Sequence, residues 1–289
     1  MVSPRANGVL PSWHYPVVIA TAFALFAFLQ LTGVSLILST YIPVLLTASL
    51  VTWLELRFPH RAEWRPAPSE VRTDLVFMVV VQLAFPPLVA FVFTYALIAP
   101  ARALNLPLAW LWPHAWPIWI QAVLMILVVD FLRYWLHRAA HMNDTLWRLH
   151  SVHHSVEQLY WLNTARFHPL EKALQMVLDS LPFLLMQVDG KVLALYYIAY
   201  ATNGFFQHCN IQLRYGVLNY IVGSAETHRW HHSRVPRESN ANYGNTVIIW
   251  DLVFGTWFLP REREITDLGL QEAAYPKSFL LLMRAPFRR

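Results

Sequence analysis

The sequence predicts an all-α integral membrane helical bundle of four to six spans, with a histidine-rich cap at one membrane face. Hydrophobic residues make up 56% of the 289 residues and charged residues only 13%, whereas soluble domains contain about 25% charged residues. Apolar runs longer than about 18 residues occur more than once, and runs of that length can cross a membrane as helices.

The first part of the chain, residues 1–116, is expected to contain the N-terminal transmembrane helices. Val17–Leu36 and Tyr41–Leu56 should form a helical hairpin. Its bend is expected near Ser39 and Thr40. The first run is too long for the apolar region of a signal peptide, and no small-residue cleavage site follows it. We therefore interpret it as a retained span.

Two further spans are predicted near the middle of the chain. Leu75–Ala99 should cross the membrane with a kink at Pro86-Pro87, because two backbone donors are missing there. Ile118–Leu136 should return across the membrane and begins the expected core region, residues 117–260.

A second apolar pair follows, formed by Leu170–Val188 and Val192–Phe206. Asp179 and Pro182 interrupt its first half, so the sequence leaves open whether this pair spans the membrane. Two crossings or none return the chain to the same side. Residues 261–289 are therefore expected to form a basic tail on the side of the polar segment that precedes the pair.

Arginines flank the predicted spans on one side of the membrane, which is typical of the cytoplasmic side. They are Arg57, Arg61, Arg65, Arg72, Arg133, Arg138 and Arg148. The opposite loop contains four tryptophans expected in an aromatic belt, namely Trp110, Trp112, Trp116 and Trp119. The polar segment His137–Pro169 should thus face the cytoplasm, in an inner or plasma membrane.

Composition also excludes some classes of protein. The single cysteine, Cys209, cannot form an intrachain disulfide or a thiolate metal cluster. The formal net charge is +5, but no dense basic stripe with interleaved aromatic residues is present, so no nucleic-acid partner is expected. The expected partners are the membrane itself and a lipid substrate.

Ten of the 13 histidines lie between positions 137 and 232, and most of them follow helical spacing. The regular clusters are His137 and His141, then His150, His153 and His154, then His228, His231 and His232. Residues three and four apart lie on one helix face with about 5–6 Å between Cβ atoms, so the imidazoles of a cluster can converge. The isolated His14, His60 and His114 are interpreted as ordinary surface or interfacial residues.

Such clusters indicate metal binding. Closely packed imidazoles repel one another when protonated, and a metal ion requires neutral ring nitrogens. With about four to six ligands per ion, eight to ten histidines suit two ions better than one. Zinc would fit nitrogen ligands but has no redox chemistry, whereas iron would allow activation of O2 as a co-substrate.

At this point the chain resembles the fatty acid hydroxylase superfamily, which includes sterol desaturases and alkylglycerol monooxygenase. The resemblance is carried by DFLRYWLHRAAH, LWRLHSVHH, TARFHPLE, HRWHH, NYGN and WDLVFGTW, in that order between Asp130 and Phe258. It implies a membrane fold, a histidine-bound di-iron centre, and the use of O2 with external electrons. The chain lacks the fused cytochrome of larger members, so a separate ferredoxin or cytochrome b5-like donor is expected.

The resemblance also implies ligands. It assigns the three regular clusters to the three histidine boxes of the family. His208, in FFQHCN, matches an additional histidine that precedes the third box. His168, in RFHP, matches a recurrent family histidine and is included as a tenth candidate ligand, although its place before Pro169 also suits the rim of the site.

Supporting residues can be proposed from spacing. Asp130, Tyr134, His137 and His141 share one helix face. An acidic residue near the end of a span is usually functional or paired, so Asp130 should orient a ligand imidazole; the alternative is a salt bridge to a neighbouring arginine on its helix.

Further polar residues lie within or beside the motifs. Asn242 is a candidate for holding a metal-bound water. Glu171, Glu226 and Asp251 could support ligands or serve as structural hydrogen-bonding groups, and for Asp251 the structural role is favoured.

The expected reaction is oxidation of a C–H bond in an acyl chain, sterol or ether lipid, with hydroxylation as the first choice and desaturation as the alternative. Two rivals come from other classes. A bis-histidine haem electron carrier needs axial pairs on facing helices at membrane depth. A metal transporter should place its ligands near the bilayer midplane. The histidine clusters instead lie beyond the ends of predicted spans.

Overall fold

The computed structural model of this protein describes residues 8–103, 108–265, 267–272 and 274–288. In these ranges it contains helices and isolated bridges but no β-strand. The α-helices are α1 (His14–Leu31), α2 (Leu36–Arg57), α3 (Pro68–Phe77), α4 (Phe85–Phe93), α5 (Ala99–Ala103), α6 (Ile118–Met142), α7 (Asp144–His154), α8 (Pro169–Asp179), α9 (Leu181–Leu185), α10 (Gly190–His208), α11 (Ala225–His231), α12 (Pro236–Ser239), α13 (Ile249–Phe254) and α14 (Phe279–Arg284). The predicted all-α class is confirmed.

Four helical segments of the described chain are long and apolar enough to cross a membrane. They are His14–Leu31, Leu36–Arg57, Pro68–Ala101 and Ile118–Met142. The expected apolar pair after Pro169 is not among them. Its first half is divided between α8, which ends at Asp179, and the short α9, which begins at Leu181. The protein is thus a multi-pass membrane protein at the lower limit of the predicted number of spans.

The α1–α2 hairpin turns earlier than the sequence suggested. Gly33 has φ +79°, a conformation that glycine adopts without steric cost. Ser35 caps α2 by accepting a hydrogen bond from Leu38 N. The predicted bend residues Ser39 and Thr40 lie inside α2 and are buried, so their small side chains serve helix packing.

The third span is continuous but irregular. Pro86 and Pro87 lie in the first turn of α4, where a missing backbone donor is tolerated. The residues just before α4, Met78–Ala84, form π-helical turns, which widen the helix and frequently occur at functional sites. The kink predicted at the two prolines is therefore accommodated by the π-helical turns of Met78–Ala84 just before them.

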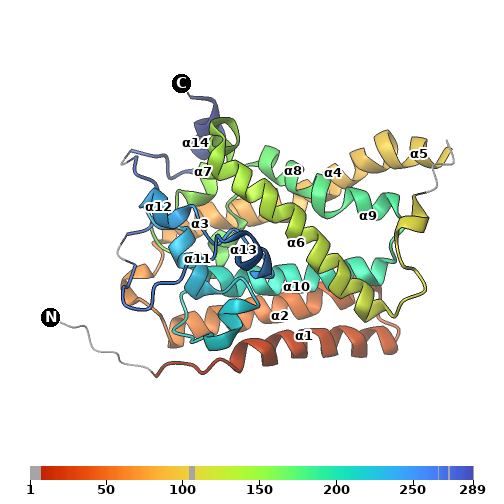
Figure 1. Ribbon diagram of the computed structural model, residues 1–289, viewed down its shortest axis with the longest axis horizontal. Coiled ribbons are helices and arrows are strands. Elements are labelled where there is room, and N and C mark those ends of the chain that lie inside the picture. The colour runs from red at the N-terminus through yellow and green to blue at the C-terminus, as the bar shows by residue number, and fades with distance from the viewer. Residues whose placement is uncertain (1–7, 104–107, 266, 273, 289) are drawn as a thin grey trace.

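Helix α10 forms the centre of the bundle. It packs against α1, α2 and α6, and Figure 1 shows α1, α2 and α10 running side by side with α6 crossing them obliquely. Met125, Val129, Leu195 and Phe206 are among the buried residues of this core. The packing brings the C-terminal ends of α6 and α10 to the end of the bundle that carries α7 and α11 (Figure 1).

The two ends of the bundle differ as the arginine and tryptophan patterns suggested. The loop after α2 lies at the histidine-bearing end, where His60 N donates to Asn210 O, two residues after α10. The tryptophan-containing loop before α6 lies at the opposite end (Figure 1). Trp110 and Trp116 are exposed there, whereas Trp112 is buried and donates to Gln121.

The C-terminal segment, expected to be a tail, packs in part against the core. Helix α14 contacts α3, and Leu282 is fully buried. The hydroxyl groups of Tyr275 and Ser151 lie 2.7 Å apart, which joins the segment to α7. These contacts cover one side of the histidine-bearing end.

Candidate metal centre

Nine histidines from α6, α7, α10, α11 and the residue after α11 form two groups at one end of the bundle. Group one consists of His137, His141, His150, His154 and His231. Group two consists of His153, His208, His228 and His232. Within each group the candidate ligand atoms all lie within 4.8 Å of one another. Each group can therefore surround one metal ion.

The division of the histidines follows helix geometry. Residues i and i+4 differ by about 40° around a helix, while residue i+3 lies about 60° to the other side. His150 and His154 accordingly enter group one, and His153 turns to group two. In α11 the pattern is exchanged, since His228 enters group two with His232, whereas His231 enters group one. Each triplet thus contributes to both groups.

Six of the nine rings have their Nδ1 atom bound by an acceptor outside the two groups. The pairs are His137 with Tyr243 O at 2.8 Å, His141 with Asn240 Oδ1 at 3.0 Å, His150 with Glu171 Oε1 at 2.7 Å, His153 with Arg166 O at 3.3 Å, His208 with Asn163 Oδ1 at 2.8 Å, and His231 with Ala241 O at 2.7 Å. A neutral imidazole carries one N–H, so the proton of these rings is on Nδ1. Their Nε2 lone pairs are then free for metal binding.

The Nε2 atoms converge more closely than hydrogen bonding can explain. His154 Nε2 lies 3.1 Å from Nε2 of His141, His150 and His231. It could donate at most one proton, so at least two of these contacts bring lone pairs together. His137 Nε2 is buried and has no hydrogen-bond partner among the described residues. A cation in each group would remove this repulsion, and the donor set therefore fits a metal.

The electrostatic environment keeps the imidazoles neutral. Burial lowers the pKa of His153 to about 3. Burial and then the neighbouring imidazoles also lower the pKa of His154, His228 and His232 well below the usual value. Neutral rings are the form that binds metal.

The loop 241–244 supports group one. Asp251 accepts hydrogen bonds from Tyr243 N at 2.8 Å and Gly244 N at 2.6 Å. This holds the carbonyl groups of Ala241 and Tyr243 toward His231 and His137. A Cβ atom at Gly244 would lie 2.5 Å from the Val247 carbonyl oxygen, so the loop requires glycine there. The favoured structural interpretation of Asp251 agrees with these contacts.

Asn242 does not have the expected position. Its φ is +56°, a conformation that asparagine tolerates better than most residues. Its amide donates to Thr227 O and Phe258 O, and its Oδ1 accepts from Phe258 N at 2.8 Å. The side chain joins α11 to residue 258, and these contacts favour a structural role over the expected contact with a metal-bound water.

Asp130 also acts differently from the prediction. It is fully buried, and its Oδ2 accepts a hydrogen bond from Val247 N rather than from a histidine. The alternative salt bridge is not formed either, because Arg133 pairs with Asp179 at 3.2 Å. Asp130 therefore holds the segment that follows the 241–244 loop and affects the histidines only through it.

His168 lies outside both groups. Its Nδ1 accepts from Leu170 N at 3.2 Å, and its Nε2 lies 3.3 Å from Met283 O. These contacts make it the cap of α8 and a contact for the C-terminal segment. The geometry favours the rim position over a place among the ligands.

Other supporting residues were identified in part. Glu171, singled out from its motif, contacts His150. Glu226 instead accepts from Tyr215 N and Asn219 Nδ2 and is structural. Asn163 and Asn240 were missed, because they lie outside the helices that carry the histidines they contact, and spacing gave no signal for them.

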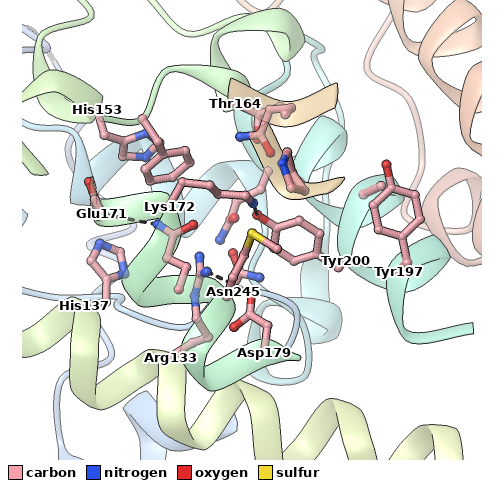
Figure 2. Close-up of a pocket in the computed structure, with 18 of the residues that line it drawn as sticks. Arg133, His137, His153, Thr164, Glu171, Lys172, Asp179, Tyr197, Tyr200 and Asn245 are labelled. Atoms are coloured by element: carbon pink, nitrogen blue, oxygen red, sulfur yellow. Dashed lines mark hydrogen bonds and ion pairs between the residues drawn. The ribbon is translucent and has the colours of Figure 1, made fainter. Parts of the chain in front are cut away.

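A cavity of about 200 Å³ opens beside the two groups. His137, His150, His153, His208 and His228 line one end. The cavity passes between α6, α8 and α10, and Figure 2 shows His137 and His153 on its left, Lys172 and Tyr200 near its middle, and Tyr197 on its right.

Leu83, Pro86 and Pro87 of the third span also line the cavity. Leu83 is exposed. A substrate in this cavity would therefore lie between the histidines and the membrane-facing side of the third span.

Comparisons with known proteins identify the family and relatives of the chain. The fatty acid hydroxylase family model matches residues 122–256. The chain is 33% identical to the ornithine lipid hydroxylase OlsE of Rhizobium tropici over 248 residues, which cover 84% of this chain and 74% of that protein. It is 32% identical to the alkylglycerol monooxygenase of Homo sapiens over 170 residues, 58% of this chain but 35% of that protein.

A further relative is the alkylglycerol monooxygenase of Xenopus tropicalis, which is 31% identical over 57% of this chain and 34% of its own length. The chain thus spans about a third of the alkylglycerol monooxygenases that it matches. No solved structure matches the chain. With a matching family model and an extensively aligned lipid hydroxylase, the chain belongs to the fatty acid hydroxylase family and is a membrane oxidoreductase of lipids.

Proposed function

We propose that this protein hydroxylates a membrane lipid with O2, using two iron ions held by the nine histidines of groups one and two. The observation that carries the proposal is the opening of both groups onto one cavity, through His137 and His150 of group one and His153, His208 and His228 of group two. A C–H bond in this cavity would lie directly beside the metal ligands.

The proposed reaction balances as a monooxygenation. One atom of O2 enters a C–H bond to form an alcohol, and the other leaves as water. Two electrons and two protons must be supplied from outside the substrate. Iron bound by the histidines would supply the activation of O2, which a redox-inactive metal such as zinc could not.

The residues of the chain have distinct tasks in this proposal. Six of the nine histidines bind metal through Nε2 while acceptors at Nδ1 orient their rings. Glu171, Asn163 and Asn240 fulfil this task with side chains, and the loop 241–244 fulfils it with carbonyl groups. The walls formed by α8 and α10 position the substrate and limit access of water.

The experiment is a comparison of lipids from cells with and without the protein, grown under 18O2. We expect a lipid whose mass rises by one labelled oxygen atom, and about two iron ions per purified chain. His231→Ala should lose metal and product, whereas His114→Ala, which alters an exposed histidine in the loop at the opposite end of the bundle, should keep both. Unchanged iron content and product in His231→Ala would contradict the proposal.

The same experiment separates hydroxylation from desaturation. A desaturase would remove two hydrogen atoms and leave no labelled oxygen in the product. Two kinds of relative, an ornithine lipid hydroxylase and alkylglycerol monooxygenases, support hydroxylation of a polar lipid. We propose that the electrons come from a separate ferredoxin or cytochrome b5-like protein.

We further propose that the histidine groups face the cytoplasm in an inner or plasma membrane, because the arginine-rich loops lie at the same end. Cys209, the only cysteine in the sequence, is fully buried, so introduced cysteines can be labelled selectively. Thr145→Cys and Ala115→Cys lie at exposed positions at opposite ends of the bundle. In sealed inside-out vesicles an impermeant maleimide should label only the first, and labelling of only the second would reverse the orientation.

A further inference from the structure

We propose that the cavity binds the polar head of its lipid, and that this head carries both an anionic or acceptor group and N–H donors, as a zwitterionic amino-acid head does. This inference rests on the proposed lipid hydroxylation and deepens it. It places the oxidised carbon near the head of the lipid rather than near the end of an acyl chain.

The first support is the charge buried around the cavity. Arg133, Glu171, Lys172 and Asp179 all line it, and each is more than nine-tenths buried. Burying charged groups is unfavourable unless they are paired or used. A cavity that accepted only hydrocarbon would be expected to have apolar walls. Figure 2 shows these four side chains lying around the space beside His137 and His153.

The second support is that part of this charge has no internal partner. Arg133 and Asp179 pair with each other at 3.2 Å. Lys172 forms no ion pair within 4 Å among the described residues. Its ammonium contacts the hydroxyl group of Tyr200, at 3.4 Å, and the face of that ring, and it is close enough to Glu171 and Asp179 to interact with them electrostatically without a direct contact. An ammonium group has three donors, so Lys172 can bind an acceptor on a ligand.

The third support is a pair of unused acceptors beside Lys172. Glu171 Oε2 and Gln175 Oε1 are buried and have no hydrogen-bond partner among the described residues. Both residues lie on the cavity wall in α8, within one helical turn of Lys172. Buried polar atoms are rarely left without partners. A ligand with N–H donors would satisfy these acceptors.

Together these groups select the chemistry of the ligand. A carboxylate alone, as in a free fatty acid, could pair with Lys172 but would leave both acceptors without donors. An alkane or sterol skeleton would satisfy neither kind of group. A zwitterionic head with an amine and a carboxylate can satisfy all three at once, because its donors and acceptors have the complementary arrangement.

The position of these residues determines which part of the lipid is oxidised. Glu171 contacts His150 of group one through its other oxygen, so a head bound at α8 lies next to the metal groups. Leu83, Pro86 and Pro87 of the third span give the cavity an apolar lining, and Leu83 is exposed on the surface. An acyl chain would leave there toward the membrane, and the carbons near the head would remain beside the histidines.

The test is a binding measurement on the full-length, metal-loaded protein in detergent, without reductant, so that no turnover occurs. Three probes with the same acyl chain are compared: an Nα-acyl diamino acid with free amine and carboxylate, the free fatty acid, and a 1-O-alkylglycerol. We expect the zwitterionic probe to bind about tenfold or more tightly than either of the others, which is the effect of one well-satisfied interaction.

Variants identify the residues responsible. Lys172→Met and Gln175→Leu should each remove most of this preference, whereas Lys172→Arg should retain part of it. Lys191→Met is the matched control, because Lys191 is exposed at the start of α10. Metal content and thermal unfolding establish that each variant is folded, and Gln175→Leu carries the test if Lys172→Met does not fold.

Equal affinity for the three probes would overturn the inference, and so would an unchanged preference in both Lys172→Met and Gln175→Leu. The proposed function can fail separately. A protein that binds the zwitterionic probe selectively but adds no labelled oxygen under 18O2 would contradict hydroxylation and leave head-group recognition intact. Hydroxylation near the far end of the acyl chain would contradict the placement of the head beside the histidines and leave the proposed hydroxylation intact.

Discussion

The hydrogen bond between Glu171 and His150 offers the sharpest test of the metal centre. The two atoms, Glu171 Oε1 and His150 Nδ1, lie 2.7 Å apart, and the side chains are 8% and 2% exposed. Replacing Glu171 by leucine would leave the His150 N–H without an acceptor in a buried site. A stranded buried polar group costs about 1–3 kcal/mol.

This energy predicts the size of the effect. Since about 1.4 kcal/mol corresponds to a tenfold change in an equilibrium constant, Glu171→Leu should weaken metal binding in group one by roughly 10- to 100-fold, as is common for residues that orient a ligand imidazole. Glu171→Gln keeps an acceptor oxygen and should weaken it less. Group two, which Glu171 does not contact, should be much less affected.

The assay is competition for iron between the lipid-free protein and a chelator, which measures both binding steps without turnover. Glu157→Gln serves as the control, because Glu157 is exposed and pairs with Lys277 on the surface. If Glu171→Leu retained two iron ions with the affinity of the unmodified protein, the assigned role of Glu171 would be refuted. Loss of iron from both groups together would instead indicate that the variant had lost its fold.

Three further outcomes are expected. His208→Ala should lose the metal of group two, whereas His168→Ala should keep about two ions per chain in elemental analysis; the reverse result would restore His168 as a ligand. Gly244→Ala should destabilise the protein by about 1–3 kcal/mol, because its Cβ atom would lie 2.5 Å from a backbone carbonyl oxygen. Gly8→Ala is the control: its Cβ atom would meet open space, so the unfolding temperature should change little. Metal-free protein should lose stability as the pH falls from about 6.5 toward 3. In this window the histidines of the unfolded chain bind protons, whereas buried histidines of the folded chain do not, as for His153 with its pKa of about 3. An unfolding temperature that stayed constant from pH 7.5 to pH 5 would contradict the buried neutral rings.

Helical periodicity in the sequence was sufficient to predict most of the candidate ligands. Positions three and four apart lie on one face of a helix whatever the helix packs against. The three clusters were therefore identifiable before any tertiary contact was known, and all eight of their histidines enter one of the two groups. The length of the apolar runs likewise predicted membrane spans, because span length depends on bilayer thickness.

The loops that hold the rings in place could not be predicted in this way. Asn163 and Asn240 contact His208 and His141 across 45 and 99 residues of sequence. Asp130 shares a helix face with His137, yet its carboxylate binds Val247 N, 117 residues away. Hydrogen bonds between distant segments depend on how the helices pack, and local spacing contains no information about this.

By itself, the sequence determined that this chain would be an all-α membrane protein with its histidines in helical clusters, because hydrophobicity and local periodicity act over a few turns of helix. Only the tertiary structure decided that each triplet divides between the two histidine groups, that His168 remains outside them, and that Lys172 and Gln175 border the same cavity as the histidines. The physical reason is that a ligand set is closed by side chains from several helices, and their mutual orientation arises from the packing of α6, α8, α10 and α11.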